Sequence, residues 1–405
     1  MALINRLLVY TPNSIGLGHL FRTLAVATGI RRCRPDLDIL VLTGSSLPQV
    51  LLKEGIEVVK LPGIMQEVEN ESRTYRPRHL SGLGIDHLIR LRKKIIEDVF
   101  TFYQPDAVML EHKLAGLMGE ASVLLRQKIA AAGKADEFAL IHLSRGNLGR
   151  LGIPRVFDFD SERYDLVDLY DYHYILDDAS EAAAWRILRE STPGLRDKIF
   201  FLGKTTIKTR AELPSRPEVL KRLGLPDQSI ILASLGRHGD ISGIFSRLLG
   251  ACETAGLMPD RQLAVILDPY LKEETREELE RLGRSVDVIF LPFVFNLIEL
   301  INISELVVCR AGYNTVNEIQ LTGVKAVVIP EHHPSGEQEL RAAGLSGNIA
   351  VIHEKDVLGG GLTEILPEVL NRKPAPSGYD FNKYEIGRRI IEDLESWAAR
   401  RQPSS

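Results

Sequence analysis

The chain has 405 residues, of which 44% are apolar and 26% are charged, and its formal net charge is −4. This length exceeds what one hydrophobic core serves and fits two domains of ordinary size. The composition is that of a soluble globular protein, and the slightly acidic balance argues against a general nucleic-acid binder. The three cysteines form no metal or disulfide pattern, which favours a reduced cytoplasm. The longest apolar stretch, 287–303, is interrupted by polar residues and a proline, so no membrane span is expected.

The first half alternates short β-branched runs with amphipathic segments of helical length, the pattern of a parallel α/β domain. The N-terminus lacks the apolar core of a signal peptide and leads directly into a strand. We predict strands at Leu7–Thr11, Ile39–Thr43, Glu57–Lys60, Ala107–Glu111, Ala139–Leu143, His173–Ile175 and 199–203. Helices are predicted between them at 20–32, 46–54, 84–102 and 115–132.

A second α/β series follows a polar, proline-containing segment at 204–217 that is typical of a linker. Its strands are predicted at Ser229–Ser234, Leu263–Leu267, Val286–Leu291, Leu306–Cys309, Ala326–Ile329 and Ala350–Ile352. The pattern predicts an α/β protein with two Rossmann-like domains facing across a cleft. The N-terminal domain would span 1–203 and include a C-terminal helix at 380–400 that crosses back to it. The C-terminal domain would span 218–377.

The turn after the first predicted strand is rich in glycine and leads straight into a helix. Gly16 and Gly18 permit a tight turn and a close approach to a ligand, although a Gly-x-Gly pair alone is weak evidence. His19 stands in the first helical turn, where the helix dipole lowers its pKa and leaves it able to accept a proton. Together with Arg22, the Gly-x-Gly-His-x-x-Arg pattern favours a functional His19 over a structural one.

Two turns in the second half have the character of anion sites. The turn after the strand at 229–234 carries Ser234, Gly236 and Arg237, which suit a diphosphate unless the loop is merely solvated. The turn at 308–315 leads from a buried strand into a helix, so its N–H groups and the helix dipole face one point. Glu318, further along that helix, is placed to reach a neighbouring hydroxyl. A phosphate beside a hydroxylated ring indicates a nucleotide.

Several polar residues follow other predicted strands. Phe293 suits either a nucleobase or an ordinary core position, and the loop at 330–342 offers polar side chains to sugar hydroxyls. The histidine pair in that loop has no further ligand at metal-binding spacing, so no metal site is predicted. Glu111 and His112 end one predicted strand of the first domain and Arg145 follows another, where a cap or loop salt bridge is the alternative role. The basic run at 90–94 is interpreted as a solvated helix face or as a weak membrane-surface contact.

These motifs together resemble a known pattern. The chain resembles glycosyltransferases of the GT-B fold, in particular the peptidoglycan N-acetylglucosaminyltransferase branch and related predicted glycosyltransferases. The likeness is best over 286–345, and the Gly-x-Gly-His-x-x-Arg motif within 1–30 is similar. The sequence departs from the family at 13–15, which is poorer in glycine, at the Arg237-His238 pair, where small residues are usual, and at Arg341, where an Asn is usual.

The resemblance implies a metal-independent enzyme with a nucleotide-sugar cosubstrate, expected to be UDP-linked. Glu318 would bind the ribose hydroxyls, Phe293 would border the uracil, and Gln338 would touch the donor sugar. The full donor-binding set is expected to be Gly18, Ser234, Gly236, Arg237, Phe293, Arg310, Ala311, Gly312, Asn314, Thr315, Glu318 and Gln338. Arg22 and Arg145 are expected to bind the acceptor, whose pocket would lie within about 64–90 and 145–165.

The expected reaction is an inverting transfer. His19, or as a second choice Glu111, would deprotonate an acceptor hydroxyl that attacks the anomeric carbon opposite the diphosphate, and domain closure would exclude water. Three alternatives remain open at this point. The first is a nucleotide-sugar hydrolase of the pseudaminic-acid-pathway type, a class that carries a similar first motif. The second is a sugar-nucleotide 2-epimerase, although this sequence shows no matching acid and base carboxylates. The third is a nucleotide-sugar binding subunit, which would need a catalytic partner.

Overall fold

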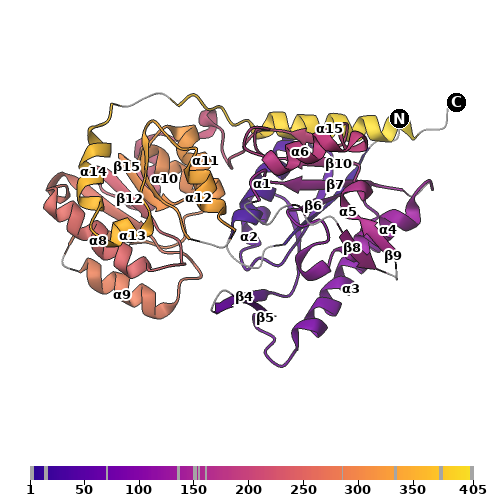
Figure 1. The fold of residues 1–405 in the computed structure, drawn as a ribbon, viewed down its shortest axis with the longest axis horizontal. Helices are drawn as coiled ribbons and strands as arrows, with labels where there is room; N and C mark the ends of the chain where they lie inside the picture. The colour runs from indigo at the N-terminus through magenta and orange to yellow at the C-terminus, as the bar shows by residue number, and fades with distance from the viewer. Residues whose placement is uncertain are drawn as a thin grey trace. The chain divides into compact units, whose positions relative to one another are not determined.

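In a computed structural model the chain forms two compact units (Figure 1). The structure describes residues 4–12, 17–69, 72–134, 137–148, 153, 156–159, 162–284, 286–332, 335–373 and 377–401. The first unit comprises Met1–Thr205 together with Asn382–Ser405, and the second comprises Thr206–Phe381. Within the described residues, no helix is both long enough and apolar enough to span a membrane.

The first unit is built on a seven-stranded parallel sheet in the order β11-β10-β7-β6-β1-β2-β3. Its strands are β1 (Arg6–Thr11), β2 (Asp38–Thr43), β3 (Glu57–Lys60), β6 (Ala107–Glu111), β7 (Ala139–Ser144), β10 (Tyr172–Ile175) and β11 (Ile199–Phe201). Its helices are α1 (Gly18–Cys33), α2 (Gln49–Leu52), α3 (Ile85–Tyr103), α4 (Ser122–Ala131), α5 (Leu166–Leu169), α6 (Ala183–Ser191) and α15 (Lys383–Arg400). Every residue of β6 and β7 is buried. Such continuous burial explains why these strands are uninterrupted apolar runs rather than alternating ones.

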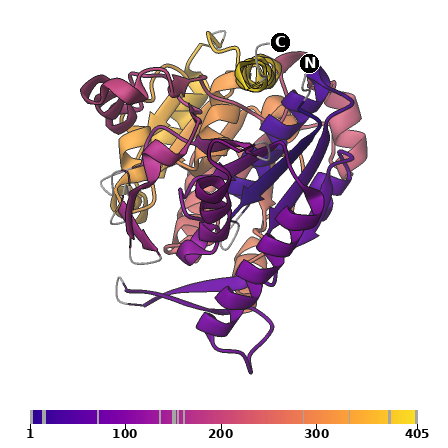
Figure 2. The ribbon, with the colours of Figure 1, turned by 90° about the vertical axis from the view of Figure 1, so that its right-hand side faces the viewer.

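Two antiparallel hairpins extend this Rossmann-like core and were not predicted. They are β4 (Ile64–Glu69) with β5 (Ser72–Pro77), and β8 (Val156–Phe159) with β9 (Glu162–Asp165). The β4–β5 hairpin projects from the body of the unit (Figure 2). Both hairpins lie in the segments expected to form the acceptor pocket. Their strands mix charged and apolar residues, so the sequence has no clear strand period there.

The second unit is a six-stranded parallel sheet in the order β14-β13-β12-β15-β16-β17. Its strands are β12 (Ser229–Ser234), β13 (Arg261–Ile266), β14 (Val288–Leu291), β15 (Leu306–Arg310), β16 (Lys325–Ile329) and β17 (Ile349–Val351). Its helices are α7 (Arg216–Leu223), α8 (Ile241–Thr254), α9 (Glu273–Gly283), α10 (Leu297–Ile303), α11 (Tyr313–Thr322), α12 (Glu337–Ala342), α13 (Glu354–Leu358) and α14 (Leu362–Asn371). Ile231 and Ala233 pack in one core and Ile230 and Leu232 in the other, so both faces of the sheet are covered.

The segment 204–217 is structured over most of its length. The boundary between the units falls between Thr205 and Thr206, ahead of most of the segment. Lys208 Nζ lies 2.7 Å from a carboxylate oxygen of the buried Glu299, and Arg210 donates a hydrogen bond to the carbonyl of Leu321. These contacts tie the connection to the second unit.

The C-terminal helix α15 packs against α1 of the first unit, as predicted (Figures 1 and 2). The two helices meet at a pair of glycines. A Cβ atom added at Gly387 would lie 2.2 Å from the carbonyl carbon of Gly29, and one added at Gly29 would lie 2.2 Å from the carbonyl oxygen of Lys383. The absence of side chains at this crossing allows the two backbones to touch.

This crossing gives a stability prediction. Gly387→Ala should destabilise the first unit by about 1–3 kcal/mol, because the methyl group must push α1 and α15 apart. Gly250→Ala in α8 is the matched control, since nothing lies within 4 Å of an added Cβ there. The control should gain about 0.5–1 kcal/mol from the helix preference for alanine. Urea unfolding of both variants measures the difference, and equal midpoints would contradict the prediction.

Candidate functional site

The first unit gathers polar side chains at the carboxyl ends of three adjacent strands. His19 is the second residue of α1, which follows β1, Glu111 is the last residue of β6, and Arg145 follows β7. Because β1, β6 and β7 are neighbours in a parallel sheet, these three positions lie at one edge. Open α/β sheets bind their ligands at that edge. Gly18 is exposed next to His19, whereas Gly16 lies outside the described residues.

The His19 ring is held by the carboxylate of Glu111. Nδ1 of His19 lies 2.7 Å from Oε2 of Glu111, and Nε of Arg22 donates to Oε1 at 2.8 Å. Glu111 and Arg22 are buried, whereas the His19 side chain is 23% exposed. Arg22 Nη2 lies 2.9 Å from the same Nδ1, but it is closer to Oε1 of Glu111 and donates its hydrogen bond to that oxygen. An ionised carboxylate can only accept, so the Glu111 contact places the proton on Nδ1 and leaves Nε2 as the basic nitrogen.

The surroundings set the charge states of this pair. Burial by itself would raise the pKa of Glu111, but the charges of Arg22 and His19 outweigh it and hold that pKa well below its ordinary value. Burial lowers the pKa of His19, although the Glu111 carboxylate opposes the shift. At neutral pH the arrangement is therefore an ionised carboxylate beside a neutral imidazole.

Two further histidines lie close to this edge. The sequence had indicated a cap or loop salt bridge for His112, and it had not indicated His142. His112 has a left-handed backbone (φ 70°), and its ring centroid lies 4.7 Å from that of His19. Nε2 of His142, on β7, lies 3.0 Å from the carbonyl oxygen of His112. Burial lowers the pKa of His142 to about 4, so its ring is neutral at physiological pH. The positive charge of Arg145 contributes to lowering the pKa values of both His19 and His112, after the larger effect of burial.

The second unit presents its predicted donor residues in the same way. Ser234 is the last residue of β12, Gly236 and Arg237 follow it, Phe293 follows β14, and Gln338 follows β16 in sequence. The remaining predicted donor residues follow or end β15: Arg310, Ala311, Gly312, Asn314, Thr315 and Glu318. The structure thus brings the predicted set to the carboxyl edge of one sheet, except for Gly18, which lies in the first unit. Phe293 is partly buried.

Glu318 is a buried carboxylate on α11. The residue is 8% exposed, and burial raises the pKa of its carboxyl group to about 8. None of the hydrogen bonds found among the described residues reaches its side-chain oxygens. A buried polar group of this kind costs free energy until a partner satisfies it. The position therefore suits a ligand that supplies hydroxyl donors.

Arg237 lies between an acidic and an aromatic side chain. Its Nη1 atom is 3.9 Å from Oδ1 of Asp268, and its guanidinium carbon is 5.1 Å from the ring centroid of Tyr270. Neither partner had been singled out from the sequence. Both residues follow β13, which lies next to β12 in the sheet, and this position could have indicated that they lie near Arg237.

The loop after β16 is closed by its own hydrogen bonds. The Gln338 amide accepts from the backbone N–H of Glu331 at 3.1 Å and donates to the Glu331 carboxylate at 2.9 Å. Arg341 donates to the carbonyl of Ala311 at 2.6 Å and lies over the ring of Tyr313. Arg341 therefore ties this loop to the start of α11.

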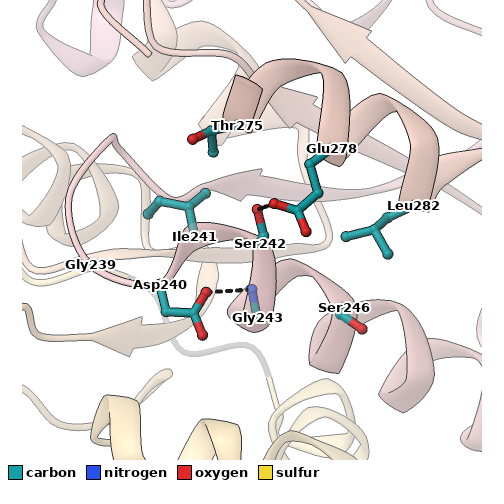
Figure 3. Close-up of a pocket in the computed structure, with 9 residues that line it drawn as sticks. All are labelled: Gly239, Asp240, Ile241, Ser242, Gly243, Ser246, Thr275, Glu278 and Leu282. Carbon is teal, nitrogen blue, oxygen red and sulfur yellow. Dashed lines mark hydrogen bonds between the residues drawn. The ribbon is translucent and has the colours of Figure 1, made fainter. Parts of the chain in front are cut away.

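A cavity of about 500 Å³ opens beside the turn after β12 (Figure 3). The Asp240 carboxylate accepts from the N–H of Gly243 at 2.8 Å and so caps α8. Ser242 donates to Glu278 of α9 at 2.6 Å. The cavity is lined by Gly239, Asp240, Ile241, Ser242, Gly243, Ser246, Thr275, Glu278 and Leu282. The described part of the chain contains no cluster of three metal-ligating side chains, and His333 lies outside it.

Both a family model and named relatives match this chain. Residues 251–378 match the model of the glycosyltransferase family 28 C-terminal domain. The chain is 22% identical over 379 residues to a UDP-N-acetylglucosamine–N-acetylmuramyl-(pentapeptide) pyrophosphoryl-undecaprenol N-acetylglucosamine transferase of Listeria monocytogenes, which covers 92% of this chain and 93% of the relative.

Solved structures of similar fold span nearly the whole chain. UDP-GlcNAc 2-epimerase of Neisseria meningitidis aligns with a TM-score of 0.61 at 16% identity, covering 97% of this chain and 100% of that one. MurG of Acinetobacter baumannii aligns with a TM-score of 0.53 at 15% identity, covering 97% and 99%. These findings identify the chain as a glycosyltransferase of the GT-B fold that resembles the peptidoglycan N-acetylglucosaminyltransferase branch.

Proposed function

We propose that the chain transfers a sugar from a UDP-sugar to an acceptor hydroxyl, with inversion at the anomeric carbon and without a metal ion. The first unit would activate the acceptor, and the second would bind the donor. The family match over the second unit supports sugar transfer. A UDP-linked donor is supported by the relatives, which include a UDP-N-acetylglucosamine-dependent transferase and an epimerase of the same fold bound to UDP-GlcNAc.

The contact between His19 and Glu111 carries the catalytic part of this proposal. The 2.7 Å distance from Nδ1 to the carboxylate leaves Nε2 unprotonated, so Nε2 takes the proton of the acceptor hydroxyl. The acceptor oxygen forms its bond to the anomeric carbon on the face opposite the diphosphate as the bond to the diphosphate breaks. Glu111 is proposed to position the His19 ring rather than to act as the base, because its low pKa makes it a poor base.

The donor would lie on the second unit. Glu318 is proposed to accept hydrogen bonds from the ribose hydroxyls, since its buried carboxylate is otherwise without donors among the described residues. The turns after β12 and β15, with Ser234 and Arg237, would hold the diphosphate. The N-terminus of α11 and the Arg237 guanidinium would stabilise the charge of the leaving UDP, the role that a metal ion has in other transferases.

The acceptor is proposed to be a lipid-linked sugar, by analogy with the pyrophosphoryl-undecaprenol substrate in the printed name of the Listeria relative. A weak membrane-surface contact through α3 is part of this proposal, but only part of the basic run is available for it. Arg92 is 1% exposed and paired with Glu120, and Lys94 is paired with Asp98 at 2.8 Å. Arg90 is exposed, as is Leu91 beside it.

Measurements of donor binding and of turnover test the proposal. A thermal-shift screen with uridine and thymidine nucleotides should show that UDP or a UDP-sugar raises the melting temperature in proportion to affinity. UDP-N-acetylglucosamine is then incubated with a polyprenyl-diphosphate-linked acceptor in the presence of a chelator, and NMR of the product should show an inverted anomeric centre. Rapid release of free sugar from the donor alone would instead assign a hydrolase. Donor binding without turnover, restored by a second protein, would assign a binding subunit.

A further inference from the structure

The loop after β12 rests on a partly buried ion pair that the site assignments above do not explain. Arg310, the last residue of β15, is 8% exposed at its side chain and lies 2.8 Å from Oε2 of Glu354, the first residue of α13. Its Nη2 donates to the carbonyl of His238 at 3.0 Å, and its Nε donates to the carbonyl of Leu235 at 3.3 Å. All three nitrogens of the guanidinium are thereby directed at the loop and at Glu354, so they do not point toward a ligand.

Glu354 also holds the loop directly. Its Oε1 accepts from the backbone N–H of Asp240 at 3.2 Å. Gly239 has φ +79°, and a Cβ added there would lie 2.7 Å from Nη2 of Arg310 and 3.0 Å from Oε2 of Glu354. The backbone of the loop therefore lies directly on the ion pair, with no room for a side chain between them.

These contacts determine which way the peptide groups of the loop face. The described peptide bonds are all trans, so each carbonyl and the N–H of the next residue point in opposite directions. The carbonyls of Leu235 and His238 point at Arg310, and the N–H groups of Gly236 and Gly239 consequently point away from it. Neither N–H donates to any group among the described residues. Two backbone donors thus face the side of the loop opposite the ion pair.

We propose that Glu354 is a positioning residue for donor binding, which acts through Arg310 to hold the N–H groups of Gly236 and Gly239 ready for the diphosphate. The inference rests on the proposed function, because it assumes that a nucleoside diphosphate is the ligand. Glu354 does not touch the ligand. Its carboxylate fixes the guanidinium, and the guanidinium fixes the two carbonyls.

The test compares two ligands on two variants. Glu354→Gln should weaken UDP binding about tenfold, since a charged hydrogen bond that orders the loop is lost. Uridine, which has no phosphate, should bind the variant as it binds the wild type. Glu305→Gln is the matched control: Glu305 accepts from Arg261 at 2.8 Å and 3.1 Å, is similarly exposed, and precedes β15 at its opposite end. Calorimetric titration of each ligand into each protein gives the affinities, and thermal melts report any general loss of stability.

The direction of the change in UDP affinity shows whether Glu354 acts by positioning the loop or only through its charge. If Glu354 acted only through its negative charge, removing that charge near an anion site would leave UDP binding unchanged or tighten it. Either result would overturn the proposal. Equal weakening of UDP and uridine would show a general structural role and would also overturn it. If the wild type binds no uridine nucleotide at all, the proposed function fails together with this inference. If the Glu354→Gln variant binds UDP as well as the wild type does, only this inference fails.

Discussion

Replacing His19 with alanine is expected to lower kcat about 10²- to 10⁴-fold, the usual contribution of a general base. The affinity for UDP should change little, because Glu318 and the turns of the second unit make the proposed donor contacts. The measurement is kcat from product formation together with the UDP affinity from calorimetry. An His19→Ala enzyme with unchanged kcat would remove His19 from the mechanism.

The pH dependence gives a second readout of the same residue. Burial lowers the pKa of His19, so the acidic limb of the kcat/KM profile should have its midpoint below the ordinary histidine value of about 6.5. Activity should fall as the pH drops through that midpoint, since protonated Nε2 cannot act as a base. Glu111→Gln should move the limb to still lower pH, because the carboxylate raises the pKa of His19. A limb that does not move would contradict the assigned role of Glu111, provided thermal melts show that the variant is folded.

Glu318→Gln is expected to weaken UDP binding about 30- to 100-fold, as a hydrogen-bonded pair with a charged acceptor is lost in a buried position. The matched ligand is 2′-deoxy-UDP, which removes one ribose hydroxyl. The wild type should discriminate strongly between UDP and the deoxy ligand, whereas the variant should hardly do so. Equal discrimination by both proteins would show that Glu318 does not contact the ribose.

The raised pKa of Glu318 makes this binding proton-linked. With a pKa of about 8 the free carboxyl group is mostly protonated at pH 7, and it must ionise to accept two hydroxyl donors. UDP binding should therefore release a proton, and affinity should rise from pH 7 until the pH exceeds about 8. Calorimetry in buffers of different ionisation enthalpy measures the proton release. Glu318→Gln is the control, because it keeps the titration of the diphosphate itself and lacks that of the carboxyl group.

Much of the architecture could be predicted from local sequence patterns. Strands such as Ala107–Glu111 are continuous apolar runs ended by polar residues, and their burial on both faces makes them recognisable. The glycine turns marked where strands give way to helices, so the candidate residues at the carboxyl edges could be located as well. The two hairpins were missed because their residues follow no regular apolar period.

The roles within the site depended on contacts between distant parts of the chain. His19 and Glu111 are 92 positions apart, so only the sheet order shows that the carboxylate holds the imidazole. Arg310 and Glu354 are 44 positions apart, and nothing in the turn at 308–315 indicates that the guanidinium points into a neighbouring loop.

The sequence by itself determined the class of fold, the positions of the strand-to-helix turns and the residue types available at each turn. These follow from local backbone preferences and from the period of apolar residues, which act over a few positions. Only the tertiary structure decided which carboxylate is ionised, which is protonated and which arginine faces the backbone. Those properties depend on burial and on charges brought together by the order of the strands, and no local pattern encodes them.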